Sequence, residues 1–258
     1  LASIDPDQTS AARLLIKSTG VLAGVKLSKM IFEAVDPLLE LEVLKHDGEK
    51  VKQGDLGLIV KGKARSILAA ERLVLNCMQR MSGIATYTDY LNSLILNTKA
   101  KLLDTRKTTP NFRIAEKWAV AIGGGTNHRF GLYDMIMLKD NHIDFAGGIR
   151  PAIEKTMQYL TAKKLSLKIE IETRNLQEVE EVLTVGNVHR IMLDNMKVPQ
   201  LEQAVGLIAG RYETEASGGI TEETIAEVAS TGVDFISVGA LTHSVKSLDI
   251  SLKATLSV

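Results

Sequence analysis

The feature that most constrains the fold of this chain is a regular alternation of short apolar strands and amphipathic helices beyond residue 101. Six segments have the β-branched or apolar character of buried strands: KLLDT from Lys101, MIMLK from Met135, LKIEIE from Leu167, RIMLD from Arg190, TEASG from Thr214 and FISVG from Phe235. Four segments predict helices, over residues 149–164, 175–185, 198–210 and 221–231. Strands that alternate with helices of this length form a parallel sheet through right-handed crossovers. So many consecutive units favour a closed or nearly closed α/β barrel.

The first 65 residues have a different pattern, in which short apolar alternation is broken by turn signals at Gly24, Asp47-Gly48 and Gly54. This pattern predicts mostly strands, with one helix near residues 26–34. The segment from His46 to Gly62 also resembles biotinyl and lipoyl carrier modules, but it lacks a modifiable lysine at a hairpin tip, so we interpret it as a scaffold sheet. Helical spacing over residues 67–95 predicts one or two long helices, with Gly83 as the weak point.

Composition excludes several classes of protein. A chain of 258 residues that is 45% hydrophobic can form one large domain or two modest ones, which excludes a disordered tail protein. Its 31 Lys+Arg and 31 Asp+Glu give no global positive field, so we expect neither nucleic-acid nor membrane partners. The single cysteine, Cys77, excludes an internal disulfide and fits a reducing compartment, and we expect a cytoplasmic location. No run of apolar residues is long enough to span a membrane, and because the chain starts with Leu1 we expect residues to precede it.

The residues that follow each expected strand form a chemically coherent set, because a barrel places its chemistry at the carboxyl ends of its strands. Cations come first along the chain, carboxylates follow, and small residues come last. The set comprises Asp104, Thr105, Arg106, Lys107, Lys139, Asp140, Asn141, Glu170, Glu172, Asp194, Asn195, Ser217, Gly218, Gly219, Gly239 and Ala240.

The cations predict an anion pocket, since residues 101–139 hold seven Lys/Arg and only three Asp/Glu. Arg106, Arg129 and Lys139, with His128 beside them, could bind a dianion or polyanion, because guanidinium groups match carboxylate and phosphate oxygens. The alternative is that they form ordinary ion pairs with Asp104, Glu116 or Asp134.

The carboxylates Glu172 and Asp194 end neighbouring strands and should stand side by side. They could hold Mg²⁺ or accept hydrogen bonds from sugar hydroxyls; a glycosidase pair or simple capping of the next helices are alternatives. The backbones of residues 217–219 and 239–240 suit a phosphate. The glycine triplet 123–125 allows a close backbone approach, but a plain turn is an equal alternative.

Six motifs occur in one order: ERLVLNCMQRMSGIAT from Glu71, LLDTRKTTP from Leu102, GGGTNHRFGLYDMIMLKDNHI from Gly123, IMLDNM from Ile191, EASGGIT from Glu215 and VGALTHS from Val238. Together they resemble quinolinate phosphoribosyltransferase, also called nicotinate-nucleotide pyrophosphorylase (carboxylating). The resemblance implies an N-terminal α/β sandwich domain over residues 1–73, to which 246–258 return. It also implies a TIM-like, irregular or incomplete α/β barrel over residues 74–245. The family usually has Gly where Asn111 stands, a residue that also adopts left-handed geometry.

The resemblance also implies roles for individual residues. Quinolinate would be bound by Arg106, His128, Arg129 and Lys139, with Thr105 adjacent and Arg72 contributed by a partner subunit. Lys107 and Lys139 would meet the phosphates of phosphoribosyl pyrophosphate, and Glu172 and Asp194 its ribose and Mg²⁺, directly or through water. Glu170 is a possible substitute for Glu172. The 5-phosphate cradle would comprise Ser217, Gly218, Gly219, Val238, Gly239 and Ala240, with His243 close by.

The implied reaction is phosphoribosyl transfer to quinolinate with decarboxylation, which gives nicotinate mononucleotide, pyrophosphate and CO₂ for de novo NAD biosynthesis. The implied assembly is a homodimer with shared active sites, which in some members forms hexamers. Two alternatives stay open. One is a sister enzyme that acts on nicotinate, or a paralogue associated with molybdenum uptake; the other is a catalytically silent sugar-phosphate-binding protein.

Overall fold

The computed structural model describes residues 2–255. It divides into two compact units: unit 1 comprises Leu1–Tyr90, Lys107–Gly125 and Ala240–Val258, and unit 2 comprises Leu91–Arg106 and Thr126–Gly239. The expected domain boundary between residues 73 and 74 falls inside helix α2 (Ala64–Leu94) and stays a prediction. No helix within residues 2–255 is long and apolar enough to cross a membrane.

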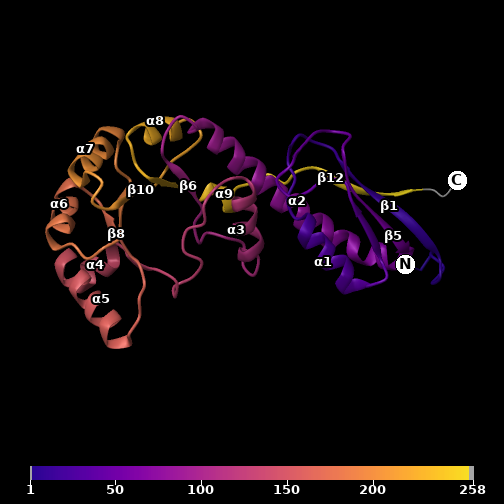
Figure 1. Ribbon diagram of the computed structural model, residues 1–258, viewed down its shortest axis with the longest axis horizontal. Coiled ribbons are helices and arrows are strands. Elements are labelled where there is room, and N and C mark those ends of the chain that lie inside the picture. The colour runs from indigo at the N-terminus through magenta and orange to yellow at the C-terminus, as the bar shows by residue number, and fades with distance from the viewer. Residues whose placement is uncertain (1, 256–258) are drawn as a thin grey trace. The chain divides into compact units, whose positions relative to one another are not determined.

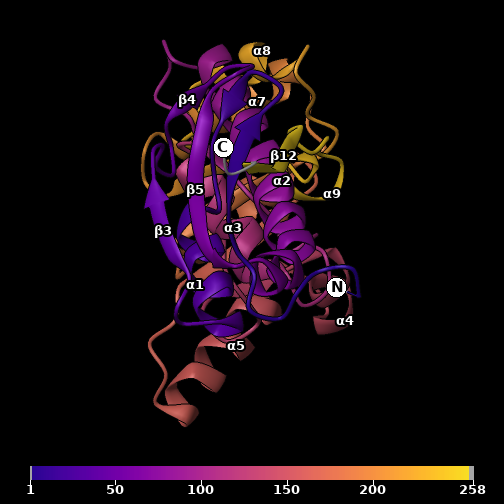
Figure 2. The ribbon, with the colours of Figure 1, turned by 90° about the vertical axis from the view of Figure 1, so that its right-hand side faces the viewer.

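Unit 1 is built on an antiparallel sheet in the order β12-β1-β5-β3. These strands are β1 (Thr9–Ile16), β3 (Glu40–Val43), β5 (Leu56–Lys63) and β12 (Ile250–Thr255), and a separate pair joins β2 (Gly20–Val21) to β4 (Lys50–Val51). Figure 2 shows the sheet in front of α1 (Val25–Val35) and α2. Burial in β1 alternates with the period of a strand, and Leu14 packs with Phe32 of α1 and Met78 of α2 in one fully buried core. The α/β sandwich prediction is confirmed.

Unit 2 contains a sheet of six parallel strands in the order β6-β11-β10-β9-β8-β7. The strands are β6 (Lys101–Leu103), β7 (Ile136–Leu138), β8 (Ile169–Thr173), β9 (Arg190–Asp194), β10 (Glu213–Ser217) and β11 (Phe235–Ser237). All six coincide with segments expected from the sequence. An isolated parallel bridge between Leu103 and Thr126 extends the β6 edge, and among the described residues β6 and β7 do not pair. The sheet is therefore an incomplete barrel.

The helices of unit 2 alternate with its strands and are visible around the sheet in Figure 1. They are α4 (Asp140–Ala146), α5 (Ile149–Lys163), α6 (Leu176–Val185), α7 (Val198–Ile208) and α8 (Ile225–Ser230). Helix α6 shows why these segments are helical: the Asn175 side chain accepts a hydrogen bond from the Glu178 backbone at 3.0 Å, and Val179 and Val182 face inward.

Helix α2 is a single helix of 31 residues, so Gly83 does not break it. A Cβ at Gly83 would lie 2.4 Å from the carbonyl oxygen of Lys246, which explains the glycine by close packing. The triplet that begins at Gly123 also packs against α2, because a Cβ there would lie 2.4 Å from the carbonyl oxygen of Ala85. The sequence patterns predict neither α3 (Arg113–Ile122) nor the short helices α4 and α9 (Ala240–His243). Asn111 adopts the left-handed conformation, with φ of 62°.

Candidate active site

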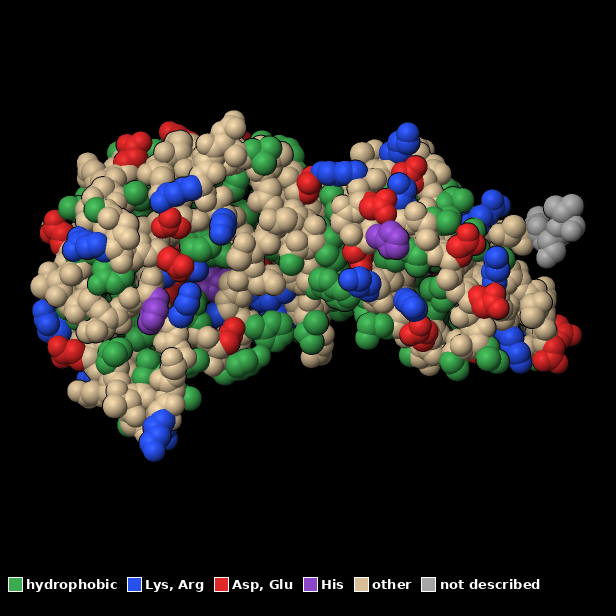
Figure 3. All heavy atoms as spheres, in the orientation of Figure 1, with side chains coloured by type: hydrophobic (Ala, Val, Ile, Leu, Met, Phe, Trp, Pro, Cys, Tyr) green, Lys and Arg blue, Asp and Glu red, His purple; other side chains and the backbone are tan. Residues whose placement is uncertain are grey.

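The carboxyl ends of the six parallel strands bring the expected polar side chains of unit 2 to one edge of the sheet, which we call the mouth. Register places Asp194 of β9 beside Ser217 of β10, and Glu172 of β8 beside Met192 of β9. Lys139 follows β7 directly and caps the start of α4. Figure 3 shows charges of both signs interspersed on the visible face of unit 2, so any excess of one sign there is local.

Two carboxylates meet at the mouth. Glu172 lies within hydrogen-bonding reach of Asp194, and the pKa of Glu172 is raised to about 7, first by burial and then by the negative charge of Asp194. The positive charge of Lys139 opposes this shift. Asp194 also accepts a hydrogen bond from the Asn195 side chain at 2.7 Å. Two carboxyl groups that disfavour each other's ionisation form a place where an added cation is stabilised.

Two guanidinium groups approach each other on the cationic side. Burial lowers the pKa of Arg129, and the charge of Arg106 lowers it further. The Arg129 guanidinium donates a hydrogen bond to the carbonyl of Met135 at 3.2 Å. Like charges held close together in partial burial are stabilised by an anionic ligand, so this pair supports the anion pocket expected from the sequence.

The acidic residues near these cations have further partners, although Asp134 also acts on Arg129. Asp104 accepts hydrogen bonds from the Asn127 side chain at 2.6 Å and from the backbone of His128 at 2.8 Å. Asp134 accepts from the backbones of Phe130 and Gly131 and attracts Arg129 electrostatically. Glu116, in unit 1, pairs with Arg80 at 2.9 Å. Asp104 and Asp134 thus shape the loop that carries His128 and Arg129.

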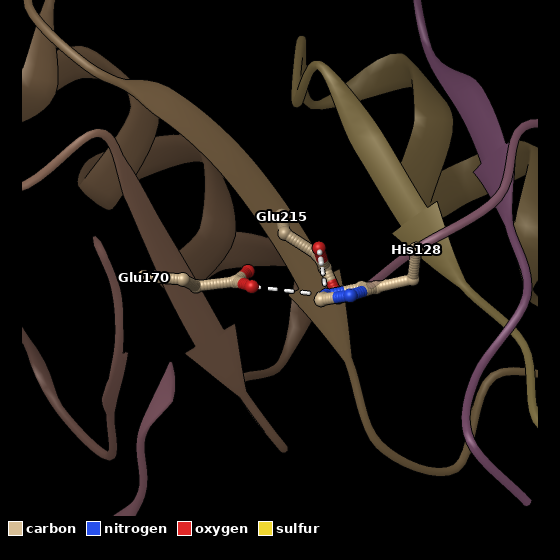
Figure 4. Close-up of side chains that lie close together, drawn as sticks. All are labelled: His128, Glu170 and Glu215. Atoms are coloured by element: carbon tan, nitrogen blue, oxygen red, sulfur yellow. Dashed lines mark ion pairs between the residues drawn. The ribbon is translucent and has the colours of Figure 1, made fainter. Parts of the chain in front are cut away.

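A buried cluster lies deeper in the sheet. His128 Nε2 is 2.9 Å from Glu170 Oε2 and 3.3 Å from Glu215 Oε2, as Figure 4 shows. Sequence reasoning considered Glu170 only as a substitute for Glu172, and it missed Glu215 and Arg190. The sequence did contain a signal for Glu170, because Glu170 and Glu172 are two positions apart on one strand and therefore face the same side of the sheet. The structure gives them separate partners, which favours Glu172 at the mouth.

A cavity of about 270 Å³ adjoins the end of β10 and is lined in part by Ser217, Gly218 and Gly219. Gly218 has φ of 96°, and a Cβ there would lie 2.2 Å from the Asn195 side-chain oxygen, so only glycine fits. The backbone of residues 217–219 is thus free of side-chain bulk at the position expected for a phosphate.

Comparison with known proteins identifies the family. Residues 1–82 match the family model described as Quinolinate phosphoribosyl transferase, N-terminal domain, and residues 84–253 match its C-terminal domain counterpart. The chain belongs to the quinolinate phosphoribosyltransferase family. It is 52% identical to "Quinolinate phosphoribosyltransferase [decarboxylating] 1b" of Nicotiana tabacum, over 98% of this chain and 75% of the relative. It is 42% identical to the "Probable nicotinate-nucleotide pyrophosphorylase [carboxylating]" of Bacillus subtilis, over 99% and 87%.

The fold agrees with solved members of the quinolinate phosphoribosyltransferase family. The crystal structure of NadC from Streptococcus pyogenes superposes with a TM-score of 0.93 at 42% identity, covering 98% of this chain and 89% of that one. The family resemblance expected from the six motifs is thereby confirmed.

The remaining residues that the family resemblance assigns are divided between the two units. Thr105, Val238 and Gly239 belong to unit 2, whereas Arg72, Lys107, Ala240 and His243 belong to unit 1. Arg72 is exposed on α2. The Lys107 carbonyl accepts a hydrogen bond from the Thr242 hydroxyl at 2.9 Å, which ties the segment after Arg106 to α9. The roles of these residues stay predictions.

Proposed function

We propose that this chain joins the anomeric carbon of phosphoribosyl pyrophosphate to the ring nitrogen of quinolinate. The bond from that carbon to the pyrophosphate oxygen breaks, the 2-carboxylate leaves as CO₂, and a proton takes its place, which gives nicotinate mononucleotide. The observation that carries the proposal is that a guanidinium pair and a carboxylate pair lie at the strand ends of one sheet, in a chain of this family.

Each group of residues has a role that follows from its charge. Arg106 and Arg129, with His128 behind them, hold the two carboxylates of quinolinate and position the ring nitrogen. Glu172 and Asp194 face the ribose, where negative charge stabilises the cationic character that develops as pyrophosphate departs. Lys139 takes up charge on the phosphates, and the backbone of residues 217–219 receives the 5-phosphate. We assign Lys107 the same phosphate role on family resemblance.

The carboxylate pair fits a magnesium ion. Mg²⁺ prefers oxygen ligands and often binds through one or two carboxylates and substrate phosphates. Burial and Asp194 raise the pKa of Glu172 and Lys139 opposes them only in part, so a bound cation would stabilise the ionised pair. Glu172 and Asp194 would hold the ion, directly or through water. When bound, it neutralises charge on the leaving pyrophosphate.

A homodimer with shared sites is part of the proposal. Arg72 lies on α2 between Leu68 and Leu73, which are 45% and 55% exposed. Exposed apolar side chains around a cation suit an interface with a second copy that receives the guanidinium. For location we propose the cytoplasm; relatives named chloroplastic and mitochondrial make fractionation of the source cells the appropriate test.

The test of the activity is direct. The protein is incubated with Mg²⁺, phosphoribosyl pyrophosphate and either quinolinate or nicotinate, and mononucleotide and CO₂ are followed by mass spectrometry. We expect product and CO₂ from quinolinate. Product from nicotinate alone would mean that the cation pair serves a single carboxylate, and no product from either would favour a silent binding protein.

A further inference from the structure

Four charged side chains form a cluster inside the sheet that the proposed reaction leaves unexplained. We call His128, Glu170, Arg190 and Glu215 the deep cluster. Glu170 and Glu215 are completely buried, and the side chains of His128 and Arg190 are 6% and 12% exposed. Burying charged groups costs free energy unless partners compensate for the lost water. The arrangement of partners therefore indicates what the cluster does.

The carboxylates of the deep cluster determine where the His128 ring carries its proton. Nε2 faces Glu170 Oε2 at 2.9 Å and Glu215 Oε2 at 3.3 Å, from two different strands (Figure 4). Burial and the charge of Glu215 raise the pKa of Glu170 to about 7, whereas Glu215 is held ionised and would repel a bare nitrogen lone pair, so we infer that Nε2 carries a proton. Arg190 donates to the same oxygen of Glu215 at 2.9 Å, which keeps that carboxylate ionised.

The opposite edge of the ring, at Nδ1, contacts the backbone of Arg129. The backbone N–H of Arg129 donates to Nδ1 of His128 at 2.6 Å, which requires an unprotonated Nδ1. The two carboxylates outweigh burial and raise the pKa of His128 to about 9, which favours a second proton on the ring. The short contact to Arg129 opposes that second proton. Because this contact requires a bare Nδ1, we infer that the ring carries one proton, on Nε2.

We propose that Glu170 and Glu215 are positioning residues, which hold the proton of His128 on Nε2 and thereby keep Nδ1 as the acceptor that fixes the backbone of Arg129. This inference rests on the proposed function, since it is the quinolinate pocket that Arg129 serves. The contacts connect Glu170 and Glu215, inside the sheet, through the imidazole of His128 to Arg129, which would bind quinolinate. Outer partners of this kind orient functional histidines in metal sites.

A cation in place of the proton is the competing explanation. One ligand atom each from His128, Glu170 and Glu215 lies within 4.8 Å of the others, a spacing that could suit a metal ion. A metal would bind a bare Nε2, whereas the proposal requires Nε2 to be protonated. Arg190 also supplies positive charge to Glu215, which reduces the need for a metal.

The first test needs no variant. Nitrogen NMR of the wild-type protein labelled at its five histidines distinguishes the tautomers, and a His128→Gln protein identifies the His128 signals. We expect Nε2 protonated and Nδ1 unprotonated in protein treated with a chelator. The reverse tautomer, or signals of a metal-bound Nε2 that the chelator abolishes, would overturn the proposal.

The second test links the tautomer to substrate. In the double variant Glu170→Gln, Glu215→Gln, we expect the tautomer preference to be lost and the KM for quinolinate to rise by about tenfold or more, with the KM for phosphoribosyl pyrophosphate nearly unchanged. The matched control is Glu213→Gln. Glu213 pairs with Arg190 at 3.1 Å and is not one of the carboxylates that face His128, so its substitution should change neither value.

The outcomes separate the two proposals. Loss of the tautomer preference with an unchanged KM for quinolinate would contradict a role for Glu170 and Glu215 in substrate binding. An equal effect of Glu213→Gln would assign the effect to Arg190 and contradict it as well. A wild-type protein without activity would contradict the proposed function. The tautomer measurement would still show which ring nitrogen of His128 carries the proton. If the double variant does not fold, the wild-type tautomer decides.

Discussion

Two pairs of carboxylates in the same parallel sheet, Glu170 with Glu215 and Glu172 with Asp194, differ in the positively charged side chains that face them. Glu215 of the deep cluster is fully buried, yet His128 and Arg190 hold its pKa below the ordinary value although burial alone would raise it. At the mouth, burial and Asp194 raise the pKa of Glu172 to about 7, and Lys139 opposes them only in part. Within the deep cluster Glu215 is thus held in its ionised form, whereas burial and the charge of Glu215 raise the pKa of Glu170 to about 7. Among the described residues at the mouth, Lys139 is the only group that lowers the pKa of Glu172, so an added cation or a cationic transition state would stabilise the ionised pair.

The largest expected effect comes from removing the charge of the mouth pair. Glu172→Gln or Asp194→Asn should lower kcat/KM by about a thousandfold, because preorganised charge at the reacting centre is often the largest contribution to catalysis. Steady-state kinetics measure this loss, with Glu213→Gln as the control for a carboxylate elsewhere in the sheet. If Glu172→Gln retained near wild-type activity while Glu170→Gln lost it, the roles of the two pairs would be reversed.

The second effect concerns the cationic side of the mouth. Arg106→Ala should weaken quinolinate binding by about a hundredfold while phosphoribosyl pyrophosphate binding stays measurable, because truncating one partner of a charge-assisted pair removes several kcal/mol. Calorimetric titration of each ligand tests this expectation. Equal loss of both ligands would place Arg106 outside the quinolinate pocket.

A third prediction follows from the raised pKa of Glu172 near 7. A cation binds the ionised pair, so affinity should rise with pH as the carboxyl loses its proton. With a pKa near 7 the group is about one-tenth ionised at pH 6, so Mn²⁺ should bind about tenfold more weakly at pH 6 than at pH 8. Calorimetry with Mn²⁺ alone measures this, and Glu172→Gln should abolish the dependence. A flat profile in the wild-type protein would contradict the assignment of Glu172.

The last prediction concerns a second copy of the chain, which would contribute Arg72 to the site. Arg72→Ala and Arg129→Ala proteins should each be nearly inactive. The purified mixed dimer should recover about half of wild-type activity, because it has one intact site of two. Activity after co-expression and purification of the doubly tagged dimer measures this recovery. No recovery in a confirmed mixed dimer would argue against a shared site.

The sequence predicts strands and helices with a regular apolar pattern well, and contacts between segments that are distant in the chain poorly. All six strands of the parallel sheet were expected, because runs such as RIMLD over Arg190–Asp194 are apolar, short and bounded by helices. Helix α3 was missed because it follows directly on a turn at Asn111 and carries Lys117 and Glu116 on its buried side. Gly83 looked like a weak point, since no local pattern reveals that the chain near Lys246 passes against it.

The candidate site likewise contains residues that can be predicted from the sequence and residues that cannot. Polar residues that end strands, such as Glu172 and Asp194, can be found from the sequence because topology brings strand ends together. The deep cluster could not be assigned in this way, because Glu215 lies in the middle of β10 and Arg190 at the start of β9, away from the carboxyl ends of the strands. Only register and burial show that Glu215 meets His128, which comes from a loop 87 positions earlier in the chain.

We expect the pair Glu172 and Asp194 at the mouth to bind a cation, and Glu170 and Glu215 of the deep cluster to bind none. Anomalous scattering from crystals grown with Mn²⁺ and phosphoribosyl pyrophosphate tests it most directly. We expect a manganese peak beside Glu172 and Asp194 and none among His128, Glu170 and Glu215. A peak in the deep cluster, with none at the mouth, would contradict it.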